Sequence, residues 1–84
     1  MILPTIHMNG TSREELVAQL EFASMALETA YQTLKRAAPN GRDYYPQGPE
    51  AIGVATAEHM ARLKKLDEVK HEVDRLMLGI DRIP

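Results

Sequence analysis

The sequence has no cysteine, no tryptophan, few other aromatic residues and little net charge. Without cysteine, the 84-residue chain has no disulfide and no thiolate metal site, and a reducing compartment is compatible with it. A net charge of −2 gives no support for general binding to the backbone of DNA or RNA. No apolar run approaches the roughly 20 residues of a membrane span, and the first ten residues lack the pattern of a signal peptide. We therefore expect a soluble, cytoplasmic protein without membrane contact.

Hydrophobic residues make up 44% of the chain, which argues against disorder. The length fits a single domain over residues 1–84, near the size at which one core is only marginally sufficient. No internal repeat and no low-complexity tract divides it. The residue pattern predicts two long helices joined by a corner loop.

A first helix is predicted over residues 12–38. Ser12 as N-cap would place Glu15 at the third helical position of a reciprocal capping box, and Thr11 with Glu14 offers the same arrangement one residue earlier. Apolar and small residues then recur at alternating spacings of four and three, which gives one stripe along a helix. The stripe consists of Leu16, Leu20, Ala23, Leu27, Ala30, Leu34 and Ala37.

A second helix is predicted over residues 49–78, with Pro49 at its first position and Glu50 in its first turn. One side of this helix is apolar and the other is charged. The apolar side consists of Leu63, Leu66, Val69, Val73, Leu76, Met77 and Ile80, and the charged side of Lys64, Glu68, His71, Glu72 and Arg75. Lys70 interrupts the apolar side, and its flanking Asp67 and Asp74 predict an ion pair.

These elements predict an all-α fold: a long antiparallel two-helix hairpin with an extended N-terminal arm over residues 1–10. The arm is interpreted either as a segment that packs over a neighbouring subunit or as a partly ordered tail. Away from its leucine stripe, the first helix has a wide uncharged arc, which favours burial on two sides. The arc consists of Ala18, Phe22, Met25, Ala26, Thr29 and Thr33. We therefore predict a symmetric homo-oligomer, in its simplest form a dimeric four-helix bundle.

The sequence contains none of the common catalytic motifs, neither a nucleophile elbow nor a phosphate-binding glycine loop nor a zinc-binding His-Glu-x-x-His. His59 and His71 are twelve residues apart, which rotates them roughly 120° around a helix, so one chain does not bring them to one site. We predict that the protein is not an enzyme and has neither a metal site nor a cofactor. His59 lies on the apolar side and is interpreted as a contact at a subunit seam or as a ligand-facing, pH-sensitive group.

The sequence "APNGRDYYPQGPE", which contains the corner at residues 39–48, is more elaborate than a helix connection requires. Guanidinium groups and the amides at a helix start suit phosphate, and flat rings suit a stacked base. The candidate ligand-binding residues are Lys35, Arg36 and Arg42 for phosphate, Tyr44 and Tyr45 for stacking, Asn40 and Gln47 for selectivity, and His7 and Asn9 of an arm that reaches across. Alternatively the tyrosines form a rigid plug or a subunit contact, and the two basic residues that end the first helix complement its dipole.

The segments "TIHMNGTSREEL" and "APNGRDYYPQGPEA" resemble short helical-hairpin proteins of bacteriophages and prophages. The resemblance covers most of the chain and implies a two-helix phage accessory protein in the cytoplasm of a bacterial host. By analogy of size and architecture, other small oligomeric phage proteins sequester nucleotide second messengers of antiviral defence. The expected function is therefore non-catalytic sequestration of a nucleotide signal at pockets between subunits. The alternative is a protein–protein interaction module, such as a phage assembly factor or an inhibitor of a host protein.

Overall fold

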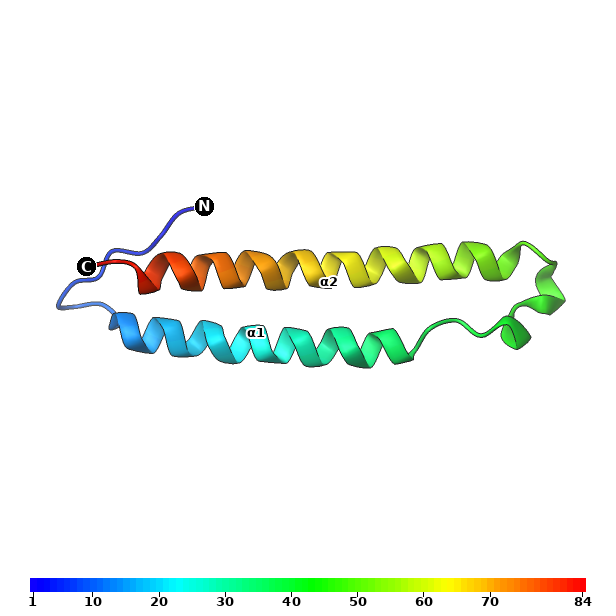
Figure 1. Ribbon diagram of the computed structural model, residues 1–84, viewed down its shortest axis with the longest axis horizontal. Helices are drawn as coiled ribbons and strands as arrows, with labels where there is room; N and C mark the ends of the chain where they lie inside the picture. Colours follow the sequence, from blue (N-terminus) through cyan, green and yellow to red (C-terminus); the bar gives the residue numbers. More distant parts are fainter.

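The protein is an antiparallel hairpin of two long helices (Figure 1). In the computed structural model, which describes residues 1–84, helix α1 extends over Arg13–Arg36 and helix α2 over Ala51–Asp81. Two single-turn 3-10 helices, η1 (Gly41–Asp43) and η2 (Tyr45–Gln47), form the corner between them. The molecule measures 62 × 20 × 17 Å, and both chain termini lie at the end opposite the corner. The predicted all-α hairpin is confirmed.

Helix α1 begins with a side-chain cap at Ser12. The backbone of this residue is extended, and its Oγ accepts a hydrogen bond of 3.1 Å from the backbone N–H of Glu15. No bond returns from the Glu15 carboxylate to Ser12, so only one half of the predicted capping box forms. The helix ends at Arg36, two residues before the predicted end. Pro39 disfavours the helical conformation for the residue that precedes it, which explains the earlier end.

Helix α2 begins two residues later than predicted, because the chain first turns at Gly48. This glycine has a φ of 109°, a value that L side chains rarely adopt. Pro49 therefore lies in the turn before the helix and not at its first position, and Glu50 is the N-cap without a side-chain cap bond. At its other end the helix continues to Asp81, three residues beyond the predicted boundary.

The N-terminal arm packs on its own hairpin. Its first residues and the ends of both helices line an open apolar hollow of about 400 Å³. Leu3 lies against Gly79, where a β-carbon would come within 3.0 Å of the leucine Cδ2. Gly79 thus lies within α2 and leaves room for the arm. The Arg13 guanidinium donates to the carbonyl of Ile83, which ties the start of α1 to the C-terminal residues.

The interface between the two helices is thin. Only five of the 84 residues are buried, three of them apolar and two polar. They are Ala55, Leu63 and Ile80, with Ser24 and His59. In the predicted stripe of the first helix, Ala23 and Ala30 are exposed, and Ser24 and Tyr31 face the partner helix more closely. The stripe is rotated by one residue at these points, because a serine that bonds across the interface replaces an apolar side chain there.

The Ser12 cap gives a direct test of this helix start. Ser12→Ala is expected to lower the free energy of unfolding by about 1 kcal/mol, since the N–H of Glu15 loses its acceptor. Thr11→Ala is the matched control, because Thr11 makes no cap bond and its change should be close to neutral. Urea unfolding followed by circular dichroism measures both. A larger loss for Thr11→Ala would place the helix start one residue earlier and contradict the structure.

Candidate functional site

The corner consists of two successive 3-10 turns. The backbone N–H of Tyr44 donates to the carbonyl of Gly41, and that of Gly48 donates to the carbonyl of Tyr45, both at 3.1 Å. The Asn40 Oδ1 accepts from the backbone N–H of Arg42 at 3.0 Å and caps η1. The side-chain oxygen of Asn40 therefore has a local structural task, and only its NH₂ group is free to meet a ligand.

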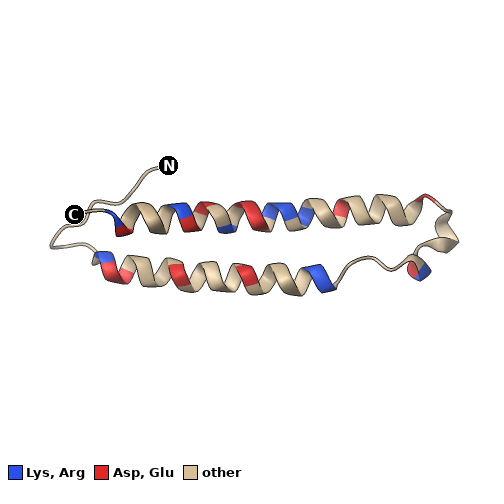
Figure 2. Cartoon of the chain, viewed as in Figure 1, with Lys and Arg blue, Asp and Glu red and all other residues tan.

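The side chains predicted to bind a ligand at the corner are mostly exposed. Tyr44 is half-buried, whereas Tyr45 is 75% exposed, so the two adjacent rings differ in their access to solvent. The other corner candidates are all exposed: Lys35, Arg36, Asn40, Arg42 and Gln47. In Figure 2 the basic end of α1 and the charged pair of η1 are separated by the segment that links them. One chain thus presents the predicted groups on exposed surface, with those of η1 and η2 at the tip of the hairpin.

No hollow forms at this tip. The four hollows of the structure are lined by the arm and by the long helices, and none includes a residue of the corner. His7 and Asn9 belong to the arm, which lies at the opposite end of the hairpin (Figure 1). Within one chain these two residues are not brought to the other candidates. A pocket that combines them needs a second chain placed end for end.

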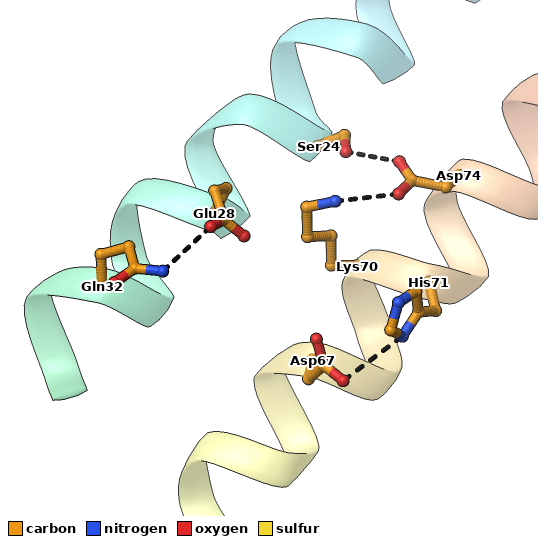
Figure 3. A network of polar contacts seen from close by, with 7 residues as sticks. All are labelled: Ser24, Glu28, Gln32, Asp67, Lys70, His71 and Asp74. Carbon is orange, nitrogen blue, oxygen red and sulfur yellow. Dashed lines mark hydrogen bonds and ion pairs between the residues drawn. The ribbon is translucent and has the colours of Figure 1, made fainter.

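A different polar cluster joins the two helices near the middle of the hairpin (Figure 3). The buried Ser24 hydroxyl on α1 donates to one carboxylate oxygen of Asp74 on α2. The other carboxylate oxygen lies 3.0 Å from the Lys70 ammonium. The predicted pairing of this lysine is confirmed with Asp74, and Ser24 is the residue that sequence reasoning missed. Its position four residues after Leu20, in line with the leucines, was the available signal.

These bonds shift two ionisation equilibria. The Ser24 hydroxyl, followed by the Lys70 ammonium, holds the pKa of Asp74 below its ordinary value of 3.8. The hydrogen bond to Asp74 is the main reason that the pKa of Lys70 is raised above 10.5. Asp74 therefore contributes stability above about pH 4 that is lost as the pH falls through its lowered pKa. The contribution of Lys70 persists below pH 10.5 and is lost only above it.

Two further pairs flank the cluster in Figure 3. The Gln32 amide donates to the Glu28 carboxylate at 3.0 Å on α1. On α2, the Nδ1 of His71 lies 3.4 Å from a carboxylate oxygen of Asp67. In each pair the two residues are four positions apart on the same helix. Such exposed pairs contribute only a few tenths of a kcal/mol to stability. The link between the helices therefore depends on the Ser24 bond and not on its neighbours.

His59 is buried inside the hairpin. Its side chain is 5% exposed, and its Nε2 has no hydrogen-bond partner. The sequence predicts that His59 lies at a subunit seam or faces a ligand, but the fold of a single chain already covers this residue. A buried polar atom without a partner destabilises a fold by about 1–3 kcal/mol, and this cost is the same in a single hairpin and in an assembly of such hairpins.

Large apolar side chains remain uncovered on the outer sides of both helices. On α1, Phe22 and Met25 belong to a strip of exposed uncharged residues at helical spacing, the α1 outer strip: Ala18, Phe22, Met25, Ala26, Thr29 and Thr33. On α2 a second strip lies near the corner, the α2 outer strip: Val54, Ala57, Met60 and Ala61. Phe22 is 71% exposed and points away from α2, since it lies two residues from the inward-facing Ser24. No other part of the chain covers these side chains.

Comparison with protein-family models, with curated proteins and with solved structures finds no match to this chain. None of its helices is of sufficient length and hydropathy to cross a membrane. No group of three or more histidine and acidic side chains converges as a metal site would require. Burial, charge and geometry are therefore the observations that bear on function.

The Asp74 bonds predict an acid-sensitive contribution to stability. Asp74→Asn is expected to reduce the loss of unfolding free energy between pH 5 and pH 3, because the depressed pKa that causes part of this loss is removed. Asp81→Asn is the matched control, since this exposed carboxylate makes no side-chain hydrogen bond. Chemical unfolding at several pH values measures the difference. If both variants retained the acid sensitivity of the parent, the Ser24–Asp74–Lys70 link would carry no such contribution.

Proposed function

We propose that the protein is a non-catalytic helical interaction module that works as a homo-oligomer, with two hairpins forming a four-helix bundle. The observation that carries this proposal is the α1 outer strip, whose apolar side chains no part of the chain covers. A surface helix of a monomer is polar on its outer side. Helix α1 instead has apolar and small uncharged residues on both sides, a pattern typical of a helix packed between two others.

The accessible area supports the same proposal. The chain exposes 6,450 Å², whereas a folded monomer of its mass of 9.4 kDa is expected to expose about 5,000 Å². The excess is greater than the roughly 800 Å² that each partner contributes to an interface of standard size. A second hairpin laid along the first would remove this excess. It would also place Phe22 and Met25 in the kind of aromatic and methionine-rich patch that is enriched at interface centres.

Phe22 is the residue to test. Phe22→Glu is expected to weaken self-association at least tenfold, because a carboxylate in a desolvated interface costs more than the 1.4 kcal/mol that corresponds to a factor of ten. Sedimentation velocity over a concentration series measures the dissociation constant. Arg75→Gln is the control, since it makes the same change of one unit in net charge on the exposed polar side of α2.

The parent protein is expected to sediment as a dimer or larger species at micromolar concentration. A parent that sediments as a monomer would refute the proposal. Equal weakening by Phe22→Glu and Arg75→Gln would show instead that net charge, and not the α1 outer strip, controls assembly.

A second candidate function is capture of a nucleotide signal at the corner of the assembled protein. It is favoured by the exposure of the Tyr45 ring in the same short segment as the exposed Arg42 guanidinium. A stacked base contributes about 1–3 kcal/mol, and guanidinium groups bind phosphate through paired hydrogen bonds. The corner of a single chain lines no hollow, so a second chain would have to enclose such a ligand.

Thermal unfolding in the presence of cyclic and linear nucleotides tests this candidate. A ligand at 100 times its dissociation constant is expected to stabilise the protein by about 2.7 kcal/mol. Arg42→Ala should abolish the stabilisation, whereas Lys64→Ala, which removes an exposed cation from the middle of α2, should leave it unchanged. The absence of stabilisation by any nucleotide would leave the protein-interaction function as the only candidate.

A further inference from the structure

We infer that two copies of the chain pair end for end, so that the arm of each copy lies beside the corner of the other. This inference rests on the proposed self-association and adds the orientation of the partner. An elongated hairpin has two ways to lie along a second copy, parallel or antiparallel. Two observations distinguish them: the distribution of charge along the hairpin and the exposed groups at its two ends.

Charge is separated along the length of the hairpin (Figure 2). The corner part, defined as residues 31–65, has six basic and three acidic residues, a net charge of +3. The remainder of the chain, the arm part, has four basic and nine acidic residues, a net charge of −5. The overall charge of −2 is thus the sum of a positive corner part and a negative arm part.

Only the antiparallel arrangement matches these charges. It places the corner part of each copy over the arm part of the other, so that opposite charges meet twice. The parallel arrangement places −5 over −5 and +3 over +3. Packed helices lie 8–10 Å apart, which is close to the screening length of about 8 Å at physiological ionic strength. Charges across the interface therefore interact, whereas those at opposite ends of the 62 Å hairpin do not.

The two ends also carry different exposed groups. At the arm end, the backbone N–H of Gly10 donates to the carbonyl of His7 and closes a turn, with Met8 96% exposed. At the corner end, Tyr45 is 75% exposed. A methionine sulfur at the edge of an aromatic ring is a favourable contact. The antiparallel arrangement brings each Met8 turn to the Tyr45 ring of the partner copy, whereas the parallel one pairs like with like.

The same orientation completes the set of candidate binding residues. In one chain His7 and Asn9 lie at the end opposite the corner. The second copy would supply them to the exposed corner of the first, where Arg42 and Tyr45 have no wall of their own. Two equivalent composite clefts would result, one at each end of the dimer.

Distances between spin labels test the orientation. The chain has no cysteine, so a single introduced cysteine carries the only nitroxide label in each copy. Gln47→Cys marks the corner end, Thr11→Cys the arm end and His71→Cys the middle, all at exposed positions. Electron–electron double resonance on the dimer at 0.15 M salt then measures the distances between copies.

For the antiparallel dimer, labels at Gln47→Cys are expected to lie nearly one hairpin length apart, close to 62 Å. An equimolar mixture of the Gln47→Cys and Thr11→Cys proteins should show a short distance, on the order of 20 Å, given the spacing of packed helices. Labels at His71→Cys should show a short distance in either orientation. Raising the salt to 1 M, where the screening length is about 3 Å, should reduce the antiparallel signal.

A short distance between Gln47→Cys labels would establish the parallel dimer and overturn the inference, while the proposed self-association would remain. A mixture of long and short distances at this position would also overturn it, because the orientation would then be unspecified. The absence of any distance between copies at all three positions, together with a monomeric mass, would overturn the proposed function itself.

Discussion

Two helices placed side by side have no interior, and this limit on burial governs the whole molecule. Each helix meets the other along one line of side chains, so the contact buries only five residues of 84. The entropic cost of ordering the chain, about 1–2 kcal/mol per residue for the backbone alone, is met in larger domains by a packed core. Here the arm adds apolar contact at one end and the corner covers the other. The α1 outer strip lies outside both, where only another molecule can cover it.

The polar link of Ser24, Asp74 and Lys70 restricts the helices in a way that the apolar contacts between them do not. Apolar side chains in a thin seam would tolerate sliding of one helix along the other, because the leucine stripe repeats. The bond from Ser24 to Asp74 is directional and joins one position on α1 to one on α2. Lys70 neutralises the charge that this bond brings toward the seam. A half-buried carboxylate with two partners therefore favours one register of the helices over others, even where it adds little net stability.

Much of this fold follows from local signals in the sequence. The Ser12 cap, the leucine stripe and the proline at the corner act on neighbouring residues, so sequence alone predicts two helices and their antiparallel pairing. The partners of Ser24 and Gly79 lie far away in the chain. The spacing from Leu20 indicates that Ser24 faces inward, but neither partner is identified before the hairpin closes. The sequence identifies the candidate residues at the corner by their chemistry, as cations for phosphate and rings for a base, and not by their arrangement in space. Their exposed arrangement, and the structural task of Asn40, depend on turns that a residue pattern does not specify.

Apolar burial and charge have different effects on the pairing of two hairpins. The exposed apolar strips favour association without a preferred direction, since the hydrophobic effect is proportional to area and is not directional. The separated charges of the hairpin supply little attraction in water. Their interaction with the charges of a second copy is attractive in the antiparallel orientation and repulsive in the parallel one. The strips would thus account for most of the affinity and the charges for the orientation, as in other interfaces where electrostatics specifies register more than strength. If so, a hairpin with evenly mixed charges and the same strips would associate as tightly and lose its composite clefts, because the arm would no longer be directed to the partner's corner.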